Sequence, residues 1–280
     1  MNDTNIIQKI SNERPGEIQA SAYSIIGHRE YQQDFAGMII EDKKAIAVIC
    51  DGMGGLNGGE TASREAVRLL LEDYIQEDPS EQFSEFLCRE AKRMDMAVRG
   101  LKNEQGESLK AGSTVVSVII CDGKLYWMSV GDSRIYVLRE DSMVAVTRDH
   151  NYRRELEEAC ERGEISKERF DKEAGSRKAE ALTSYLGMGG LRRIELNAQP
   201  FLLEDNDMIL LCSDGLYKSL DMNQIQAMIL DNQVSLKVAV KRLVRMALGL
   251  AAKSQDNTTA VLLRYHKIQV EDKEKDGALL

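Results

Sequence analysis

Short apolar runs alternate along the chain with segments of helical periodicity. Residues 18–26 (IQASAYSII) and 45–50 (AIAVIC) are strand-like, and the second is the continuous apolar run expected of a buried strand. From Glu60 onward, apolar residues return at spacings of three to five, which predicts a helix. Residues 81–103 carry a second helical stripe, from Phe83 to Leu101. We interpret both stripes as core contacts.

Residues 113–147 contain a series of apolar runs with very short connections (STVVSVII, KLYWMSV, RIYVLR and MVAVT). Asp122-Gly123 joins the first two runs and predicts a tight hairpin. This arrangement predicts an antiparallel meander. Beyond it, residues 207–213 and 258–265 predict strands, with helical segments at 223–230 and 234–252 between them. Helices, a run of strands, then helices and a strand indicate an α+β protein with antiparallel sheets.

Three segments lack this patterning. Residues 1–17 are polar and are expected at the periphery. Residues 149–180 are highly charged with little apolar face, and we expect short helices in an exposed flap. Residues 267–280 predict a solvated, disordered tail. The remaining chain, residues 18–266, is long enough to form one domain with a sizeable core.

Composition restricts the setting of the protein. The chain is 43% hydrophobic and 30% charged, and it has no apolar run near 18 residues and no signal-like start, so we expect a cytoplasmic protein without a membrane span. Its five cysteines are far apart and form no CxxC, which suits free thiols in a reducing compartment. The formal net charge of −9 serves solubility and argues against general affinity for nucleic acid.

Aspartates recur where the apolar runs stop. Asp51 follows AIAVIC and Asp214 follows DMILLCS, each before a glycine. Asp122, in the hairpin, shows that the same Asp-Gly dipeptide can be a plain turn. Further aspartates at such points are Asp34, Asp132 and Asp256. Each alone has a structural explanation as a turn or cap residue, but together they supply the oxygen ligands that Mg²⁺ or Mn²⁺ prefers.

The glycine-rich stretch after Asp51 has a second interpretation, as a phosphate cradle. Five of the eight residues 52–59 are glycine. The stretch GMGGLNGG does not match GxGxxG, because Asn57 stands where the last glycine should be, and it does not match GxxxxGK[ST]. A mobile turn before a helix is the structural alternative.

An ordered set of short motifs over about residues 20–265 resembles the metal-dependent type 2C (PPM-type) protein serine/threonine phosphatases, in their bacterial form. These motifs are R-x-x-x-Q-D (29–34), DGMGG (51–55), AGST (111–114), VGDSR (130–134), T-x-DH (147–150), SDG (213–215) and QDNTT (255–259). The resemblance implies a four-layer αββα sandwich, with two packed antiparallel sheets flanked by helices. It also implies hydrolysis of phosphoserine and phosphothreonine in proteins, opposing a bacterial serine/threonine kinase. We expect a monomer.

The resemblance further implies a centre of two Mn²⁺ or Mg²⁺ ions. By the matching motifs, Asp51 would bridge both ions and the Gly52 carbonyl would bind one of them. Asp214 and Asp256 would complete the other site. Asp34 would act directly or through metal-bound water.

Arg29 would hold the substrate phosphate, because its guanidinium suits two phosphate oxygens. Asp132 would join Asp214 at a third, weaker metal site. Arg29, Asp51 and Asp214 are thus the predicted catalytic residues. Two cations roughly 3.5–4 Å apart can bridge a hydroxide that attacks the phosphorus directly, without a phosphoenzyme intermediate.

The chain departs from the family pattern at two positions. Met53 stands where many eukaryotic relatives have a histidine that is a candidate general acid, so we expect a metal-bound water at the Asp132 site to replace it. Gln33 stands where some relatives have glutamate. His28 and His150 could lie near substrate, or could simply be hydrogen-bonded or exposed. Ser113 and Thr114 are either close supports of the metal site or plain strand residues, and His266 is expected to play no part.

Two alternatives stay open at this point. A catalytically weak, phosphatase-like binding module is the first, although retention of Arg29, Asp51, Asp214 and Asp256 favours an enzyme. Another two-metal hydrolase, such as a nuclease, fits poorly with the acidic charge. No CxxxxxR loop indicates a thiol nucleophile. Substrate selectivity is expected in the flap, whose arginines are Arg153, Arg154, Arg169 and Arg177.

Overall fold

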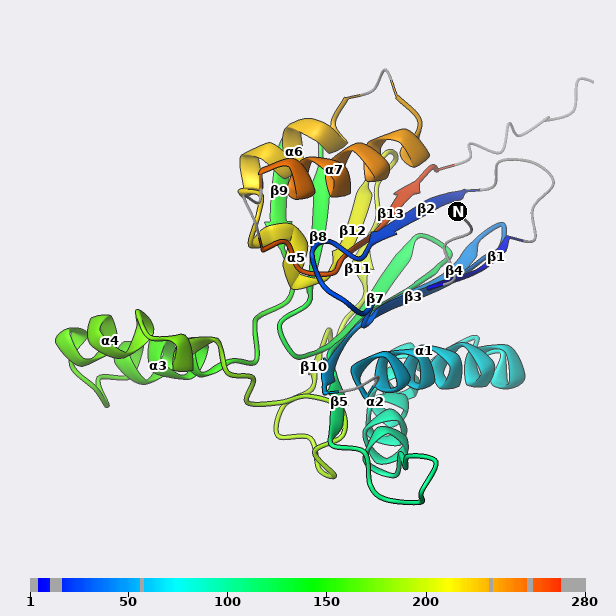
Figure 1. Cartoon of the computed structure of the whole chain (residues 1–280). Coiled ribbons are helices and arrows are strands. Elements are labelled where there is room, and N and C mark those ends of the chain that lie inside the picture. Colours follow the sequence, from blue (N-terminus) through cyan, green and yellow to red (C-terminus); the bar gives the residue numbers. More distant parts are fainter. Residues whose placement is uncertain (1–4, 11–16, 56–57, 232–233, 251–253, 268–280) are drawn as a thin grey trace, which may run out of the picture.

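Two β-sheets pack face to face, and helices cover the outer face of each sheet (Figure 1). The computed structural model describes residues 5–10, 17–55, 58–231, 234–250 and 254–267. The αββα layer order and the α+β class predicted from the sequence are confirmed. The predicted C-terminal tail lies almost wholly outside the described residues, as do parts of the N-terminal segment.

The first sheet has eight strands in the described chain, with the order β1-β3-β4-β6-β7-β10, while β5 pairs with β4 and β11 with β7. Their bounds are β1 (Ile6–Ile10), β3 (Asp34–Ile40), β4 (Lys44–Gly54), β5 (Ala111–Ser113), β6 (Val115–Cys121), β7 (Lys124–Val130), β10 (Glu195–Leu196) and β11 (Phe201–Leu202). Strand β1 pairs in parallel with β3, so the sheet is not wholly antiparallel. The N-terminal segment expected at the periphery therefore contributes a strand to the sheet.

The second sheet has five strands in the order β2-β13-β12-β8-β9, and all its pairs are antiparallel. The strands are β2 (Ile18–Ile25), β8 (Arg134–Arg139), β9 (Ser142–Ala145), β12 (Met208–Cys212) and β13 (Thr258–Tyr265). The predicted hairpin between β6 and β7 is present. Asp122 and Gly123 form its turn with φ of 47° and 71°, and Cys121 pairs with Lys124. The single antiparallel meander predicted for residues 113–147 is wrong, however. Strands β6 and β7 belong to the first sheet and β8 and β9 to the second, because the chain passes from one sheet to the other between Val130 and Arg134.

Helices α1 (Gly58–Glu77) and α2 (Phe83–Arg99) cover the first sheet, and α6 (Met222–Ile229) and α7 (Leu236–Leu250) cover the second (Figure 1). These are the helices predicted from the periodicity. A single turn, α5 (Asp214–Tyr217), follows β12 directly. Among the described residues, no helix is both long and apolar enough to cross a bilayer.

Strand β4 shows how the layers are built from sequence. Its alternate residues Ile46, Val48 and Cys50 pack against α1 and α2, while Ala47 and Ile49 pack between the sheets. Both faces of the strand are buried, which explains its continuous apolar run. The central strands are thereby held rigidly, and their polar ends are fixed in space.

The predicted flap projects from the sandwich (Figure 1). It consists of α3 (Tyr152–Glu161), α4 (Lys167–Ala174) and a 3₁₀ turn (Arg177–Glu180), as short helices were expected. Asn151 caps α3 by accepting a hydrogen bond from the Arg154 backbone N–H. An ion pair between Arg193 and Glu158 ties the flap to the chain that follows it.

Candidate functional site

The aspartates predicted to bind metal gather at one end of the sandwich, contributed by both sheets. In the first sheet, Asp34 begins β3 and lies opposite Asp51 of β4 in the strand register, and Asp132 follows β7. In the second sheet, Asp214 comes two residues after β12, and Asp256 lies two residues before β13. Strands of opposite direction place these positions at the same edge, which sequence order alone does not show.

Residues 113 and 114 hold the backbone of Asp51 within β4 by hydrogen bonds to both its N–H and its carbonyl. The strand does not stop at this residue, as its apolar run suggested, but continues to Gly54 by pairing with β5. Thr114 Oγ1 accepts from the Asp51 N–H at 3.0 Å, and the Thr114 N–H donates to the Asp51 carbonyl at 2.9 Å. Ser113 Oγ donates to the same carbonyl at 3.0 Å. Ser113, the last residue of β5, and Thr114, which lies between β5 and β6, therefore both position Asp51.

Gly52 lies where three segments cross without room for a side chain. A Cβ at this position would lie 2.0 Å from the Gly59 carbonyl oxygen and 2.8 Å from that of Gln33. The Gly52 N–H donates to the Gln33 carbonyl at 3.0 Å, and Gln33 Nε2 donates to the Gly54 carbonyl at 3.0 Å. The glycines here permit close backbone packing between β4 and the start of α1.

Asp34 is almost fully buried, with one oxygen satisfied. Ser213 Oγ donates to its Oδ2 at 2.7 Å. Its Oδ1 is buried and has no hydrogen-bond partner among the described residues. Burial raises the pKa of Asp34 to about 7; the charges of Asp214 and Asp256 add to the effect and the Ser213 hydrogen bond opposes it.

The carboxylates repel one another electrostatically. Loss of hydration within the protein raises the pKa of Asp51 well above its ordinary value, and repulsion from Asp34, Asp214, Asp132 and Asp256 raises it further. Burial, with repulsion from Asp214, also raises the pKa of Asp132 to about 7. The five aspartates are therefore close enough for their charges to interact.

Two basic side chains neutralise the cluster in part. Arg29 Nη2 lies 2.6 Å from Asp256 Oδ2. Lys218 Nζ lies 2.5 Å from Asp214 Oδ2 and 3.8 Å from Asp132 Oδ2. Arg29 was a predicted site residue, whereas Lys218 was missed. Its only sequence signal is its position four residues after Asp214, on the same face of a helical turn.

The loop that carries Arg29 is held by the QDNTT motif. Asn257 Oδ1 accepts from the Gln33 N–H at 2.8 Å. Its Nδ2 donates to the carbonyls of Ile26 and Tyr31 at 2.8 and 3.0 Å. Asn257, which sequence reasoning gave no role, therefore fixes both ends of the segment between β2 and β3.

Comparison with known proteins identifies the family of the chain. The family described as Protein phosphatase 2C matches residues 23–250. The chain belongs to the protein phosphatase 2C family. It is 28% identical over 245 residues to the serine/threonine phosphatase Stp of Listeria innocua, covering 86% of this chain and 93% of that protein.

Solved structures share the fold of this phosphatase 2C domain. The S. agalactiae serine/threonine phosphatase superposes with a TM-score of 0.76 at 24% identity, over 89% of this chain and 100% of that one. The catalytic domain of PstP, in complex with two manganese ions, superposes with a TM-score of 0.69 at 22% identity, over 89% of this chain and 99% of that one. The αββα architecture is thus that of the family.

The site residues of this phosphatase 2C domain suit a divalent cation in chemistry, although they do not form a finished coordination shell. Within the described ranges, no three His, Cys, Asp or Glu side chains form a ready metal-binding group. The carboxylates instead turn toward other partners: Asp214 toward Lys218, and Asp256 toward Arg29. The donor set nevertheless fits a hard cation, because buried Asp34 Oδ1 and Asp214 Oδ1 lack hydrogen-bond partners in the described structure.

The histidines of the domain have structural partners. His150 Nδ1 accepts from the Gly131 N–H at 3.2 Å, and the His150 N–H donates to the Gly131 carbonyl at 2.8 Å. Burial lowers the pKa of His150 to about 4. His28 Nδ1 accepts from the Gln255 N–H at 3.1 Å. Both therefore match the hydrogen-bonded interpretation.

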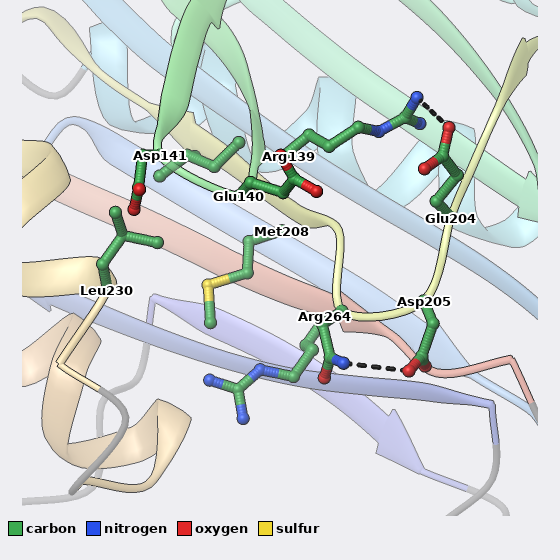
Figure 2. A pocket seen from close by; sticks show the side chains of 10 residues that line it. Arg139, Glu140, Asp141, Glu204, Asp205, Met208, Leu230 and Arg264 are labelled. Carbon is green, nitrogen blue, oxygen red and sulfur yellow. Dashed lines mark hydrogen bonds and ion pairs between the residues drawn. The ribbon is translucent and has the colours of Figure 1, made fainter.

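A pocket of about 500 Å³ lies at the opposite end of β12 and β13, near Met208 and Arg264 (Figure 2). Arg139 forms ion pairs beside it with Glu204 and with Asp207. None of the predicted site residues lines this pocket. A second pocket of about 520 Å³, whose lining includes Met53, Gly54 and Gly112, lies beside the site. Cavity volume therefore does not single out the site, whereas the carboxylate chemistry does.

Proposed function

We propose that the chain hydrolyses phosphoserine and phosphothreonine in proteins, with Mn²⁺ or Mg²⁺ as cofactor. The observation that carries this proposal is the convergence of five aspartates and Arg29 at one end of a phosphatase 2C domain. The serine/threonine phosphatases among its relatives support the same substrate class.

Two divalent ions would be held by Asp51, the Gly52 carbonyl, Asp214 and Asp256, with Asp34 acting directly or through water. Such ions supply a nucleophilic water at neutral pH and positive charge for the phosphoryl oxygens. The buried oxygens of Asp34 and Asp214 that lack partners in the described structure support this set.

Arg29 would orient the phosphate. Its side chain is 59% exposed, and in the described structure its hydrogen bond to Asp256 uses only Nη2. A guanidinium has five N–H donors, so the others remain for phosphate oxygens. An arginine guanidinium stays charged at physiological pH, and the hydrogen bond to Asp256 raises the pKa of Arg29 further.

The departing serine or threonine oxygen needs a proton that Met53 cannot supply. Water beside Asp132 is our proposed source, because Asp132 lies within the same electrostatic cluster as Asp51. We also propose that the protein acts as a cytoplasmic monomer against proteins phosphorylated by a serine/threonine kinase, with substrate selectivity from the projecting flap.

A binding module without turnover is not favoured. A phosphatase-like protein that had lost activity would be expected to lack one of the residues predicted to bind metal or phosphate. Here Arg29, Asp51, Asp214 and Asp256 are all present and close enough for their charges to interact. The comparisons likewise favour an enzyme.

The test is manganese-dependent release of phosphate from a phosphothreonine peptide. Asp214→Asn should lower kcat/KM by about 100-fold or more, because it removes a ligand charge from the metal centre. Asp122→Asn is the matched control, since its Asp-Gly dipeptide forms only the β6–β7 hairpin. An inactive wild type with bound manganese would refute the enzyme, and an unaffected Asp214→Asn variant would refute the site.

A further inference from the structure

Lys218 lies between the two carboxylates that the family resemblance assigns to a third metal ion. Its Nζ is 2.5 Å from Asp214 Oδ2 and 3.8 Å from Asp132 Oδ2. The Lys218 backbone N–H donates to the Asp214 carbonyl at 3.0 Å, so both side chains leave the same helical turn. The ammonium is therefore tethered next to Asp214 by covalent geometry.

The loop that carries Asp132 is also held in place beside Lys218. Tyr217 Oη donates to the Asp132 carbonyl at 2.9 Å. The Arg134 guanidinium stacks 3.6 Å from the centroid of the Tyr217 ring and makes a bidentate ion pair with Asp149, at 2.9 and 2.8 Å. These contacts couple the loop of Asp132 to α5, so the distance between the two carboxylates is constrained.

Asp214 divides its two oxygens between different tasks. Oδ2 accepts from Lys218. Oδ1 is buried and lacks a hydrogen-bond partner in the described structure, which leaves it for the two-ion centre. Asp132 is 5% exposed, and a buried carboxylate needs a compensating positive charge nearby. Lys218 already supplies that charge without an added ion.

We propose that the Lys218 ammonium takes the place of the third cation, so that this domain binds two divalent ions. The inference rests on the proposed function, because it presupposes the two-ion centre. A third ion would have to displace a tethered ammonium, whose attachment to α5 gives it a high effective concentration at the site. The third site at Asp132 expected from the family is then filled by a side chain.

Counting bound Mn²⁺ per chain by equilibrium dialysis tests this proposal, with free Mn²⁺ measured by electron paramagnetic resonance. Wild type and Lys218→Arg, which keeps the charge, should bind two ions. Lys218→Met keeps an unbranched side chain but removes its charged terminal group. It should bind a third ion at least about tenfold more tightly than wild type does.

Asp132→Asn provides an independent test that leaves Lys218 in place. If Lys218 fills the site, this variant should bind the same two ions as wild type. In the Lys218→Met background, Asp132→Asn should abolish the gained ion. Thermal unfolding of each variant confirms that it is folded under the dialysis conditions.

Equal binding of a third ion by wild type and Lys218→Met would overturn the proposal. A drop from three ions to two in Asp132→Asn alone would overturn it as well. Fewer than two ions in wild type would instead overturn the two-ion centre, and with it the metal assignment in the proposed function. One more bound Mn²⁺ per chain in Lys218→Met than in wild type is the result that supports the role of Lys218.

Discussion

Replacing Asp95 with asparagine should destabilise the domain by removing one acceptor from a buried loop anchor. Asp95 lies on α2 and is 2% exposed. Its Oδ1 accepts from the N–H groups of Gly187 and Gly189 at 2.8 and 3.1 Å. Its Oδ2 accepts from the Gly190 N–H at 2.7 Å. All three glycines have positive φ, which makes this loop conformation available chiefly to glycine.

The magnitude follows from which oxygen asparagine retains. An amide oxygen at the Oδ1 position keeps the bonds to Gly187 and Gly189, but the amide nitrogen then faces the Gly190 N–H, donor against donor. One hydrogen bond to a charged group is worth about 1.5–3 kcal/mol, so we expect Asp95→Asn to cost about 2–3 kcal/mol. Asp95→Ala removes all three acceptors and should cost about 3–5 kcal/mol.

Urea unfolding at pH 7, followed by circular dichroism and by the fluorescence of Trp127, measures both variants. At a slope of about 3 kcal/mol per M, the Asp95→Asn midpoint should fall by about 0.7–1 M. Asp122→Asn is the control, because Asp122 is an exposed turn residue at positive φ, which asparagine also tolerates. An Asp95→Asn midpoint equal to that of the control would refute the anchoring role.

The remaining predictions concern the site backbone and pH. Gly52→Ala should lower the free energy of unfolding by about 3 kcal/mol and abolish phosphate release, because its Cβ would lie 2.0 Å from the Gly59 carbonyl oxygen. Gly55→Ala is the control, since its Cβ would meet nothing within 4 Å. Equal unfolding midpoints for the two variants would contradict this steric argument. The pKa of His150 is lowered to about 4 in the folded state, so the unfolded state binds more protons below about pH 6.5. The free energy of unfolding should therefore decrease as the pH is lowered from about 6.5 to 4. His150→Asn should remove up to about 3 kcal/mol of that pH dependence, measured by urea unfolding at a series of pH values. The same dependence of unfolding free energy on pH in wild type and in His150→Asn would contradict this prediction.

Local patterning predicted most elements of the fold. Apolar runs and stripes indicated β2, β4, the strands β6 to β9 and the main helices, because each reflects burial of neighbouring residues along one face. They did not indicate that β6–β7 and β8–β9 belong to different sheets. Strand β3 was missed. Its Gly37 suggests a turn in sequence, yet a Cβ there would lie 2.6 Å from Leu71 Cδ1, so the glycine permits close packing of α1 on the sheet. Strand β1 was missed because polar residues flank a short run at a sheet edge.

The candidate site could be named from the sequence but not assembled from it. The order of the motifs singled out Asp34, Asp51, Asp214 and Arg29 through their resemblance to type 2C phosphatases. Only tertiary structure sets Asp34 opposite Asp51 in register. It also brings Ser213, 179 residues away in sequence, to hold Asp34.

The sequence by itself determined which side chains could serve a metal-dependent phosphatase and which segments form buried strands and helices. Tertiary structure alone decided which charges meet. Lys218 between Asp214 and Asp132, the Asp95 anchor for the 187–190 loop and the burial of His150 all depend on contacts between distant segments. Hydrophobic periodicity records only whether a position faces the core, whereas pairing of polar groups depends on strand register and on the close packing of both sheets.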